Sequence, residues 1–337
     1  MKIVFSILVL GVALVNGWTD APSAIAGCVS TRALSAKAAL ILAAISNFLG
    51  AVIMAVLCPT VAKTLYGIAD FGNDPKASII ALSSALITVI IWATAASLKG
   101  FPTSESHALI SAVCGSALAT NMSFSSIQLN EWMSVILGII ISTLPVMFFS
   151  FFIYKISIKI FSPHDRRRTM RYFTKVGRIS AAISSFLHGA QDSQKFIGVY
   201  MLGLGFLSGN TNTASANIFR IPISITLLCA AAMTLGTLIG GAKIIKKVGC
   251  EMTELDPLSS SAADTASSSF LGVCSFLGIP TATTHAKTCA LMGVGLCKKG
   301  ATNPKIVSQI FLAWFLTFPI CAILSFLLSL IAKIIFL

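Results

Sequence analysis

Charged residues are scarce in this 337-residue chain. Only 10% of its residues are Asp, Glu, Lys or Arg, and just 11 of these are acidic, whereas 56% are hydrophobic and the mean hydropathy is +0.90. Soluble domains carry about 25% charged residues. The composition therefore excludes a soluble globular domain, and the recurring apolar runs predict an all-α polytopic membrane protein without a soluble module.

Several catalytic and metal-binding signatures are absent. The nine cysteines are scattered singly, without a Cys-x-x-Cys pair or a His at metal-ligand spacing, so we predict reduced cysteines that pack in the core. No Gly-x-x-x-x-Gly-Lys-Ser/Thr motif is present, which argues against ATP hydrolysis by a P-loop. We expect neither a cofactor nor an enzymatic activity.

The long apolar runs predict eight membrane spans of about 20 residues or more each. These are Ile3 to Cys28 with a break near Gly17, Ala38 to Cys58, Ile79 to Leu98, Trp132 to Ile156, Ile179 to Leu207 with a break near Gly189, Ile221 to Ile245, Ala262 to Gly278 and Ile306 to Phe336. We expect the first run to be a retained helix and not a cleaved signal peptide, because its polar end is duplicated later in the chain.

The formal charge of +13 is concentrated in short connections between these runs. The most basic connection, residues 161–178, contains Arg166-Arg167-Arg168, Arg171, Lys175 and Arg178 and is predicted to be cytoplasmic. It separates two repeats, residues 1–160 and 179–337. Such charges set topology and meet anionic membrane lipid, so we do not expect nucleic-acid binding.

One pair of polar motifs occurs in both halves. Gly17-Trp18-Thr19-Asp20 precedes Pro102-Thr103-Ser104-Glu105-Ser106-His107, and Gly189-Ala190-Gln191-Asp192 precedes Pro280-Thr281-Ala282-Thr283-Thr284-His285. The interval from Asp to His is 87 residues in the first copy and 93 in the second. A carboxylate within a membrane is costly and usually functional, and duplicated polar breaks are typical of secondary transporters.

The Pro-led segments, residues 102–119 and 280–296, are too polar to cross a membrane alone and are predicted to be re-entrant half-helices. Helix N-termini attract anions through free N–H groups. Hydroxyls there add donors without a fixed charge, which predicts a tetrahedral oxyanion such as phosphate as the substrate. The candidate phosphate ligands are Thr103, Ser104, Ser106, Thr281, Thr283 and Thr284.

Asp20 and Asp192 would repel such an anion unless cations entered with it. Together with Thr19 and Gln191 they offer hard oxygen ligands that suit Na⁺, while protonation of the carboxylates is the other solution. Na⁺ or H⁺ is therefore the expected coupling ion, and symport follows from the charge balance.

Other polar residues of the two motifs have supporting roles. His107 and His285 are expected mainly to make structural hydrogen bonds. Lys195 lies three residues after Asp192 and can neutralise it or contact the substrate. Glu105 has no acidic counterpart in the second copy, and its role as proton site, cation site or solvated residue is left open.

At these residues the chain resembles the inorganic phosphate transporter (PiT) family. Asn16-Gly17-Trp18-Thr19-Asp20-Ala21 is similar to the amino-terminal signature of that family, and His188-Gly189-Ala190-Gln191-Asp192-Ser193-Gln194-Lys195 to its carboxy-terminal counterpart. The resemblance implies an inverted-repeat secondary transporter with broken helices, two re-entrant helical hairpins and cation-coupled phosphate uptake across the cell (inner or plasma) membrane. It adds Gln194 to the site. Thr19 and Gln191 replace the usual Asn, Ala282 replaces Ser, and Glu105 replaces a hydroxyl.

Alternatives remain open at this stage. A sulfate permease of the same family would share these motifs. An intramembrane aspartyl protease could use Asp20 and Asp192 as a dyad that shares a proton, although it would not need two hydroxyl-rich re-entrant segments. A passive anion channel is a third alternative, and assembly as a homodimer is left open.

Overall fold

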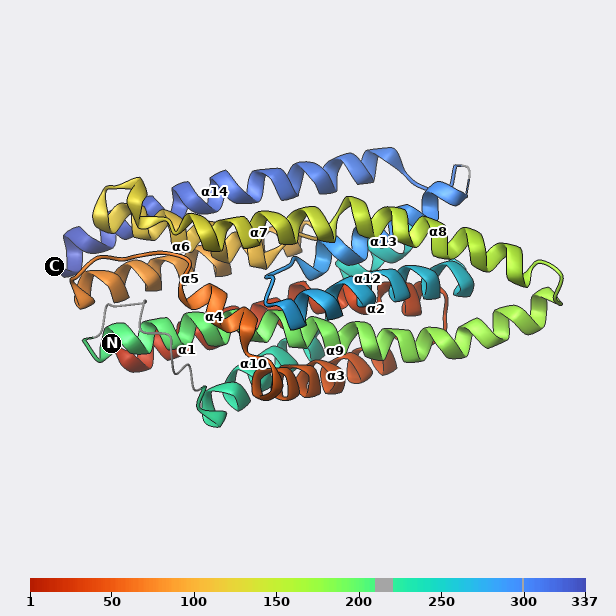
Figure 1. The fold of residues 1–337 in the computed structure, drawn as a ribbon, viewed down its shortest axis with the longest axis horizontal. Helices are drawn as coiled ribbons and strands as arrows, with labels where there is room; N and C mark the ends of the chain where they lie inside the picture. The colour runs from red at the N-terminus through yellow and green to blue at the C-terminus, as the bar shows by residue number, and fades with distance from the viewer. Residues whose placement is uncertain (210–220, 299) are drawn as a thin grey trace.

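The computed structural model describes residues 1–209, 221–298 and 300–337 as a bundle of helices that run along one long axis (Figure 1). No β-strand occurs within these ranges. The α-helices are α1 (Lys2–Thr19), α2 (Ala21–Ser30), α3 (Ala36–Leu57), α4 (Thr60–Tyr66), α5 (Pro75–Leu98), α6 (Glu105–Asn121), α7 (Leu129–Ser142), α8 (Leu144–Phe161), α9 (Arg166–Leu207), α10 (Ile223–Ile239), α11 (Ala242–Lys246), α12 (Pro257–Leu277), α13 (Thr283–Cys297) and α14 (Pro304–Phe336).

Most of the predicted spans are long, apolar helices. Among the described residues, five segments are long and apolar enough to cross a membrane, and a sixth is the bent pair Ile223–Ile239 and Ala242–Glu251, with an angle of 65°. The other two predicted spans lie in α9 and α12, which do not pass this test. Their polar side chains, such as Asp192 and Asp264, are buried inside the protein.

The first span is interrupted at Asp20, three residues after the predicted break near Gly17. Helix α1 ends at Thr19, and α2 begins at Ala21 with Pro22 in its first turn. Since proline has no N–H to donate, it cannot continue the hydrogen bonding of α1. Gly17 itself permits close packing, because a Cβ there would overlap the carbonyl oxygen of Met233 on α10.

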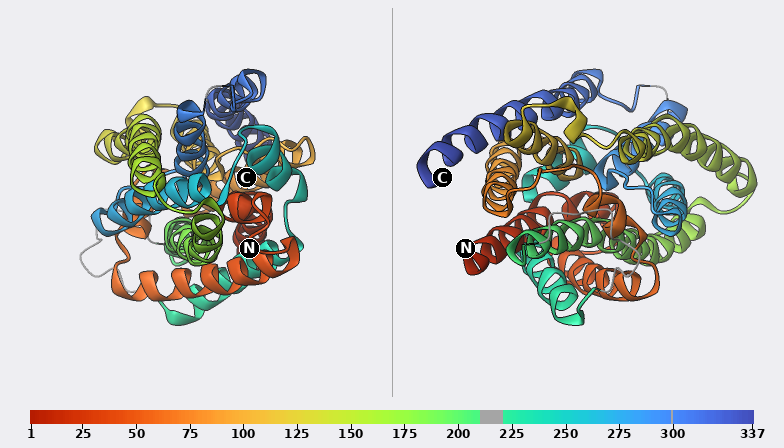
Figure 2. Two further views of the ribbon diagram at one scale, coloured as in Figure 1. Left: turned by 90° about the vertical axis from the view of Figure 1, so that its right-hand side faces the viewer. Right: turned by 60° about the vertical axis from the view of Figure 1, so that its left-hand side comes forward.

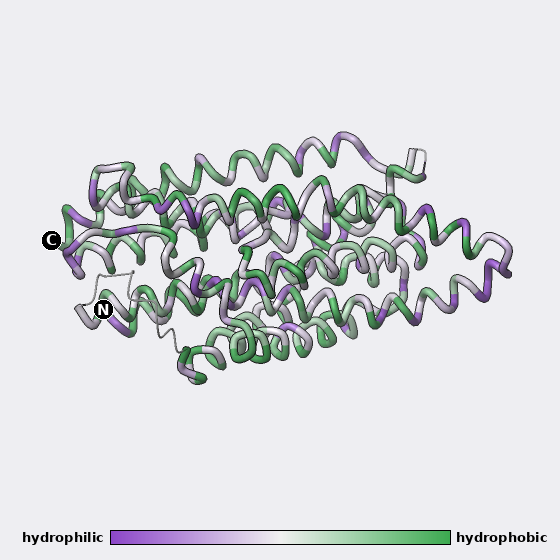
Figure 3. Tube along the Cα trace, in the orientation of Figure 1, coloured by the Kyte–Doolittle hydropathy of each residue, from purple (hydrophilic) through white to green (hydrophobic). Residues whose placement is uncertain are grey.

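The predicted break near Gly189 was wrong. Helix α9 is continuous from Arg166 to Leu207, so it also includes most of the basic connection, which projects as the charged end of the bundle (Figure 3). Glycine retains its N–H, and no proline lies nearby, so the helix does not have to stop. Gly189 instead lets α3 approach, because a Cβ at this position would overlap the backbone of Asn47.

We therefore expect Gly189→Ala to lower thermal stability through overpacking against α3, by about 1–3 kcal/mol. The matched control is Gly272→Ala in α12, where the added methyl group would meet only a Leu187 methyl group at 3.9 Å. Thermal unfolding in detergent should separate the two variants, since a helix-propensity effect alone would stabilise both of them. Equal melting temperatures for both variants would contradict this packing role.

Two helical hairpins, α5–α6 and α12–α13, occupy opposite halves of the bundle (Figure 1). Helices α5 and α6 lie in the half that contains both chain termini, and α12 and α13 lie in the other half. Within the second hairpin, Lys287 of α13 is ion-paired with Asp264 of α12, and both side chains are buried. The tips of the two hairpins meet near the middle of the protein, where the His107 and His285 rings lie 4.5 Å apart.

Helices from the two halves of the chain pack against each other. Helix α1 packs against α10 and α9 packs against α3, while α14 packs against the first hairpin and α8 packs against the second. Figure 2 shows α14 at the periphery of the bundle from two further sides. Neither half therefore forms a separate core, and the hairpin tips are held between both halves.

Candidate functional site

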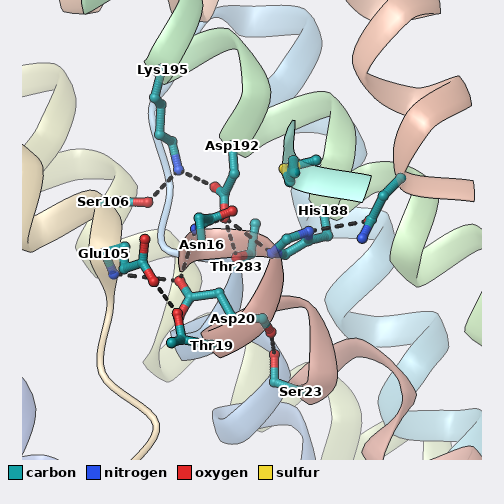
Figure 4. A network of polar contacts seen from close by, with 12 residues as sticks. Asn16, Thr19, Asp20, Ser23, Glu105, Ser106, His188, Asp192, Lys195 and Thr283 are labelled. Carbon is teal, nitrogen blue, oxygen red and sulfur yellow. Dashed lines mark hydrogen bonds and ion pairs between the residues drawn. The ribbon is translucent and has the colours of Figure 1, made fainter. Parts of the chain in front are cut away.

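A fully buried cluster of charged side chains lies where the hairpin tips meet the middle of α9 and the junction of α1 and α2 (Figure 4). Asp20, Glu105, Asp192 and Lys195 are each at most 1% exposed. Burial of this kind is costly unless each charge has a partner. The contacts within the cluster therefore indicate what the site can bind.

Asp20 and Glu105 form one side of the cluster. The Thr19 hydroxyl donates to Glu105 Oε1, and the backbone N–H of Glu105 donates to Asp20 Oδ2 at 3.4 Å. The Asn16 amide donates to Asp20 Oδ2 at 3.5 Å and to Asp192 Oδ2 at 3.3 Å. The first helix, the first hairpin and α9 are thus joined through carboxylates.

Asp192 forms the other side of the cluster, where several polar side chains contact its carboxylate. Lys195 Nζ lies 2.6 Å from its Oδ1, the Thr283 hydroxyl donates to its Oδ2 at 3.0 Å, and His188 Nε2 lies 3.2 Å from Oδ2. His188 and Lys195 can both reach Asp192 because positions three or four apart share one face of a helix.

Lys195 also connects both hairpin tips. Its ammonium group donates to Ser106 Oγ of the first hairpin at 2.5 Å and to the Thr281 carbonyl oxygen of the second hairpin at 2.5 Å. These contacts add to the ion pair with Asp192, so three separate segments converge on one cation. Lys195 therefore links the two tips to each other and to α9.

Several buried oxygens in and near the cluster have no hydrogen-bond partner among the described residues. They are Asn16 Oδ1, Asp20 Oδ1, Glu105 Oε2 and Gln191 Oε1. The described ranges contain no group of three or more His, Cys, Asp or Glu side chains that could hold a metal ion. Carboxylate and amide oxygens without thiolate or imidazole ligands fit a hard monovalent cation such as Na⁺ better than a transition metal.

The hydroxyl groups at the two tips differ in their hydrogen bonding. Ser104 caps α6 by accepting from the His107 N–H at 3.3 Å, whereas α13 has no side-chain cap. The Thr281 and Thr284 hydroxyls are buried and unpartnered within the described part of the chain. Thr103 lines a cavity of about 250 Å³ between the first tip and α14. The N-terminus of α13 therefore retains donors that an anion could use.

The remaining predicted residues have other surroundings. The His285 ring stacks on Trp314 with centroids 3.6 Å apart, and the His107 ring lies 4.7 Å from that of Phe318. Gln191 Nε2 donates to the Ile279 carbonyl oxygen at 3.4 Å, next to the second tip. Gln194 points away from the cluster, where its Oε1 accepts from the Ala62 N–H at 3.4 Å.

Two parts of the cluster were not predicted as site residues. Asn16 lies one helical turn before Asp20, and this spacing was the available signal. A second polar chain runs from Asp192 through His188 to Asn47, at 3.2 Å from His188 Nδ1, and on to the Thr237 hydroxyl at 3.0 Å. Asn47 and Thr237 lie inside the apolar helices α3 and α10, outside both copies of the duplicated motif.

Comparison with known proteins identifies the family. A family model described as "Phosphate transporter family" matches residues 16–325. The chain belongs to this family. It is 33% identical over 337 residues to a "Probable low-affinity inorganic phosphate transporter" of Bacillus subtilis, covering 100% of this chain and 98% of that protein. A protein of the same description from Rhizobium meliloti is 32% identical and covers 92% of this chain and 90% of that protein.

A solved structure has the same fold. "The sodium-dependent phosphate transporter" superposes with a TM-score of 0.85 over 99% of both chains, at 20% sequence identity. The resemblance drawn from the paired motifs is thus confirmed, as is the all-helical membrane fold. As a member of the phosphate transporter family, the chain is a multi-pass membrane transporter and not an enzyme.

Proposed function

We propose that this transporter carries inorganic phosphate across the membrane together with a coupling cation, Na⁺ or H⁺, by alternating access. The observation that carries the proposal is the meeting of two opposed hairpin tips at a buried cluster that contains more acids than bases. Membership of the phosphate transporter family and the names of the relatives support phosphate as the substrate. The fold shared with a sodium-dependent phosphate transporter supports cation coupling.

The charge of the cluster explains why a cation is needed. If all groups are ionised, Asp20, Glu105 and Asp192 contribute three negative charges and Lys195 one positive charge, which leaves two excess negative charges. A phosphate anion would add to this excess in a region of low dielectric. Bound Na⁺ ions or protons remove the repulsion, so the anion and the cation bind together.

The anion and cation sites can be assigned to different atoms of the same cluster. The phosphate would lie between the tips, bound by the hydroxyls of Ser104, Ser106, Thr281 and Thr284 and by free N–H groups at the start of α13. The cation would bind the unpartnered oxygens of Asn16 and Asp20, with Asp192 and Gln191 contributing on the side of α9. Thr103 and Thr283 are further proposed phosphate ligands, and Thr19 is a further proposed cation ligand.

We further propose that residues 1–160 and 179–337 form an inverted repeat joined by the basic segment 161–178. The packing of helices from one half against the other and the placement of the hairpins in opposite halves support this division (Figure 1). In such repeats, substrate sites lie at the interface of the two halves near the bilayer midplane. Rocking of one half against the other would open the buried site to each side in turn.

Uptake into proteoliposomes tests the proposed function. Purified protein would be reconstituted and radiolabelled phosphate supplied with an inward Na⁺ gradient, an inward H⁺ gradient or no gradient. We expect concentrative uptake under one of the gradients, which names the coupling ion. Gradient-independent equilibration would indicate a channel, and uptake of sulfate without phosphate would replace the proposed substrate.

A further inference from the structure

The two hairpin tips are chemically unequal at one position. Glu105 and Thr283 occupy the same place in the duplicated motif, because each lies three residues after the proline that opens it, Pro102 or Pro280. Both begin their half-helices, α6 and α13. One tip therefore presents a carboxylate where the other presents a hydroxyl.

Glu105 has one oxygen that its protein partners do not use. Its Oε1 accepts from the Thr19 hydroxyl, while Oε2 is buried without a partner among the described residues. The side chain is 0% exposed, so water at the protein surface does not satisfy this oxygen. A buried acceptor left unpaired is costly, which indicates that a ligand supplies the missing donor.

We propose that Glu105 is a specificity-determining residue that accepts a hydrogen bond from the P–OH group of a protonated phosphate and thereby rejects sulfate. This inference rests on the proposed phosphate site between the tips. At neutral pH, phosphate retains at least one proton, whereas sulfate has none. Sulfate would thus leave Glu105 Oε2 unpaired and place a fully deprotonated dianion against a carboxylate.

The chain offers its own neutral replacement for Glu105, namely the threonine of the second tip. A threonine hydroxyl can both donate and accept, so Glu105→Thr should remove the penalty on sulfate while the tip retains a polar residue. The inhibition constant of sulfate for phosphate uptake would be measured in proteoliposomes under the driving gradient. We expect sulfate to inhibit Glu105→Thr at least about tenfold more strongly than it inhibits the wild type.

Two further variants control for charge and position. Glu105→Asp retains the carboxylate and should remain selective against sulfate, and Glu254→Gln removes an exposed acid and should behave as the wild type. If Glu105→Thr does not transport, its preference for phosphate over sulfate can be measured in another way. The purified variant would be heated with either anion, and the two shifts in melting temperature would be compared. Sulfate should then stabilise the variant more than it stabilises the wild type.

The outcomes separate this inference from the proposed function. A wild-type protein that does not take up phosphate would refute the proposed function itself. Phosphate uptake by Glu105→Thr with unchanged rejection of sulfate would refute only the role of Glu105 in selectivity. If that variant instead requires more Na⁺ at unchanged selectivity, Glu105 is a cation ligand and the proposed contact with P–OH is wrong.

Discussion

Replacing Lys195 with methionine is expected to abolish phosphate uptake and to destabilise the protein. The ammonium group is buried and contacts Asp192, Ser106 and the Thr281 carbonyl oxygen. Its loss leaves the Asp192 carboxylate short of a counter-ion in the membrane interior. Breaking one partner of a buried ion pair costs about 3–5 kcal/mol, and the two hairpin tips lose their common donor as well.

A double-mutant cycle separates folding from transport in this prediction. Asp192→Asn, Lys195→Met and the double variant would be compared by thermal unfolding in detergent and by uptake in proteoliposomes. The double variant removes both charges, so we expect it to regain part of the stability lost in Lys195→Met. Uptake should stay absent, because Asp192 is also a proposed cation ligand and Lys195 links the two hairpin tips.

Lys298 provides a matched control for the burial of the pair. Its Nζ lies 2.6 Å from Asp256 Oδ2, the same separation as in the Lys195 pair, but the two side chains are 24% and 33% exposed. Lys298→Met should therefore cost less than about 1 kcal/mol. Wild-type stability and uptake in Lys195→Met would contradict the role assigned to the buried pair.

The membrane fold and the two hairpins could be predicted because their signals are local. Long apolar runs mark the helices, and a proline followed by hydroxyls marks the start of each half-helix. The same local rules failed at Gly189, because the sequence around a glycine does not show whether it breaks a helix or lets another helix approach. The close contact between Gly189 and the backbone of Asn47 shows that this glycine serves helix packing. That contact joins distant parts of the chain, so the local sequence does not reveal it.

The candidate site was predictable only as far as its motifs reach. Asp20, Asp192 and the tip hydroxyls stand in duplicated motifs, whereas Asn47 and Thr237 join the network through tertiary contacts between α3, α9 and α10. Gln194 shows the opposite case, since it lies within a motif but points toward α4. Motif membership thus locates the relevant helix turn, but the direction of each side chain depends on packing.

Replacing Asp20 with asparagine is expected to remove cation-coupled uptake without loss of stability. Asp20 Oδ1 has no partner among the described residues, and Glu105 and Asp192 lie in the same network. Removing one of three nearby carboxylates reduces the repulsion among them, and asparagine can still accept the Glu105 N–H. A loss of about 3 kcal/mol in cation binding would lower affinity roughly a hundredfold.

The measurement is the thermal stabilisation of the purified protein by the coupling cation, followed by uptake under its gradient. A ligand that binds only the folded state raises the melting temperature. The cation that drives uptake should therefore stabilise the wild type, and this shift should vanish in Asp20→Asn. If H⁺ drives uptake, the corresponding effect is a change in the pH dependence of stability, because the variant lacks one titrating carboxylate.

Asp74→Asn is the control for removing an acid elsewhere. Asp74 is exposed and caps α5 by accepting the Lys76 N–H at 2.9 Å, a role that asparagine also fills. This variant should keep both the uptake and the cation-dependent shift of the wild type. If Asp20→Asn behaved in the same way, the coupling cation would have to bind outside the cluster, and the excess negative charge around Asp192 would need a different explanation.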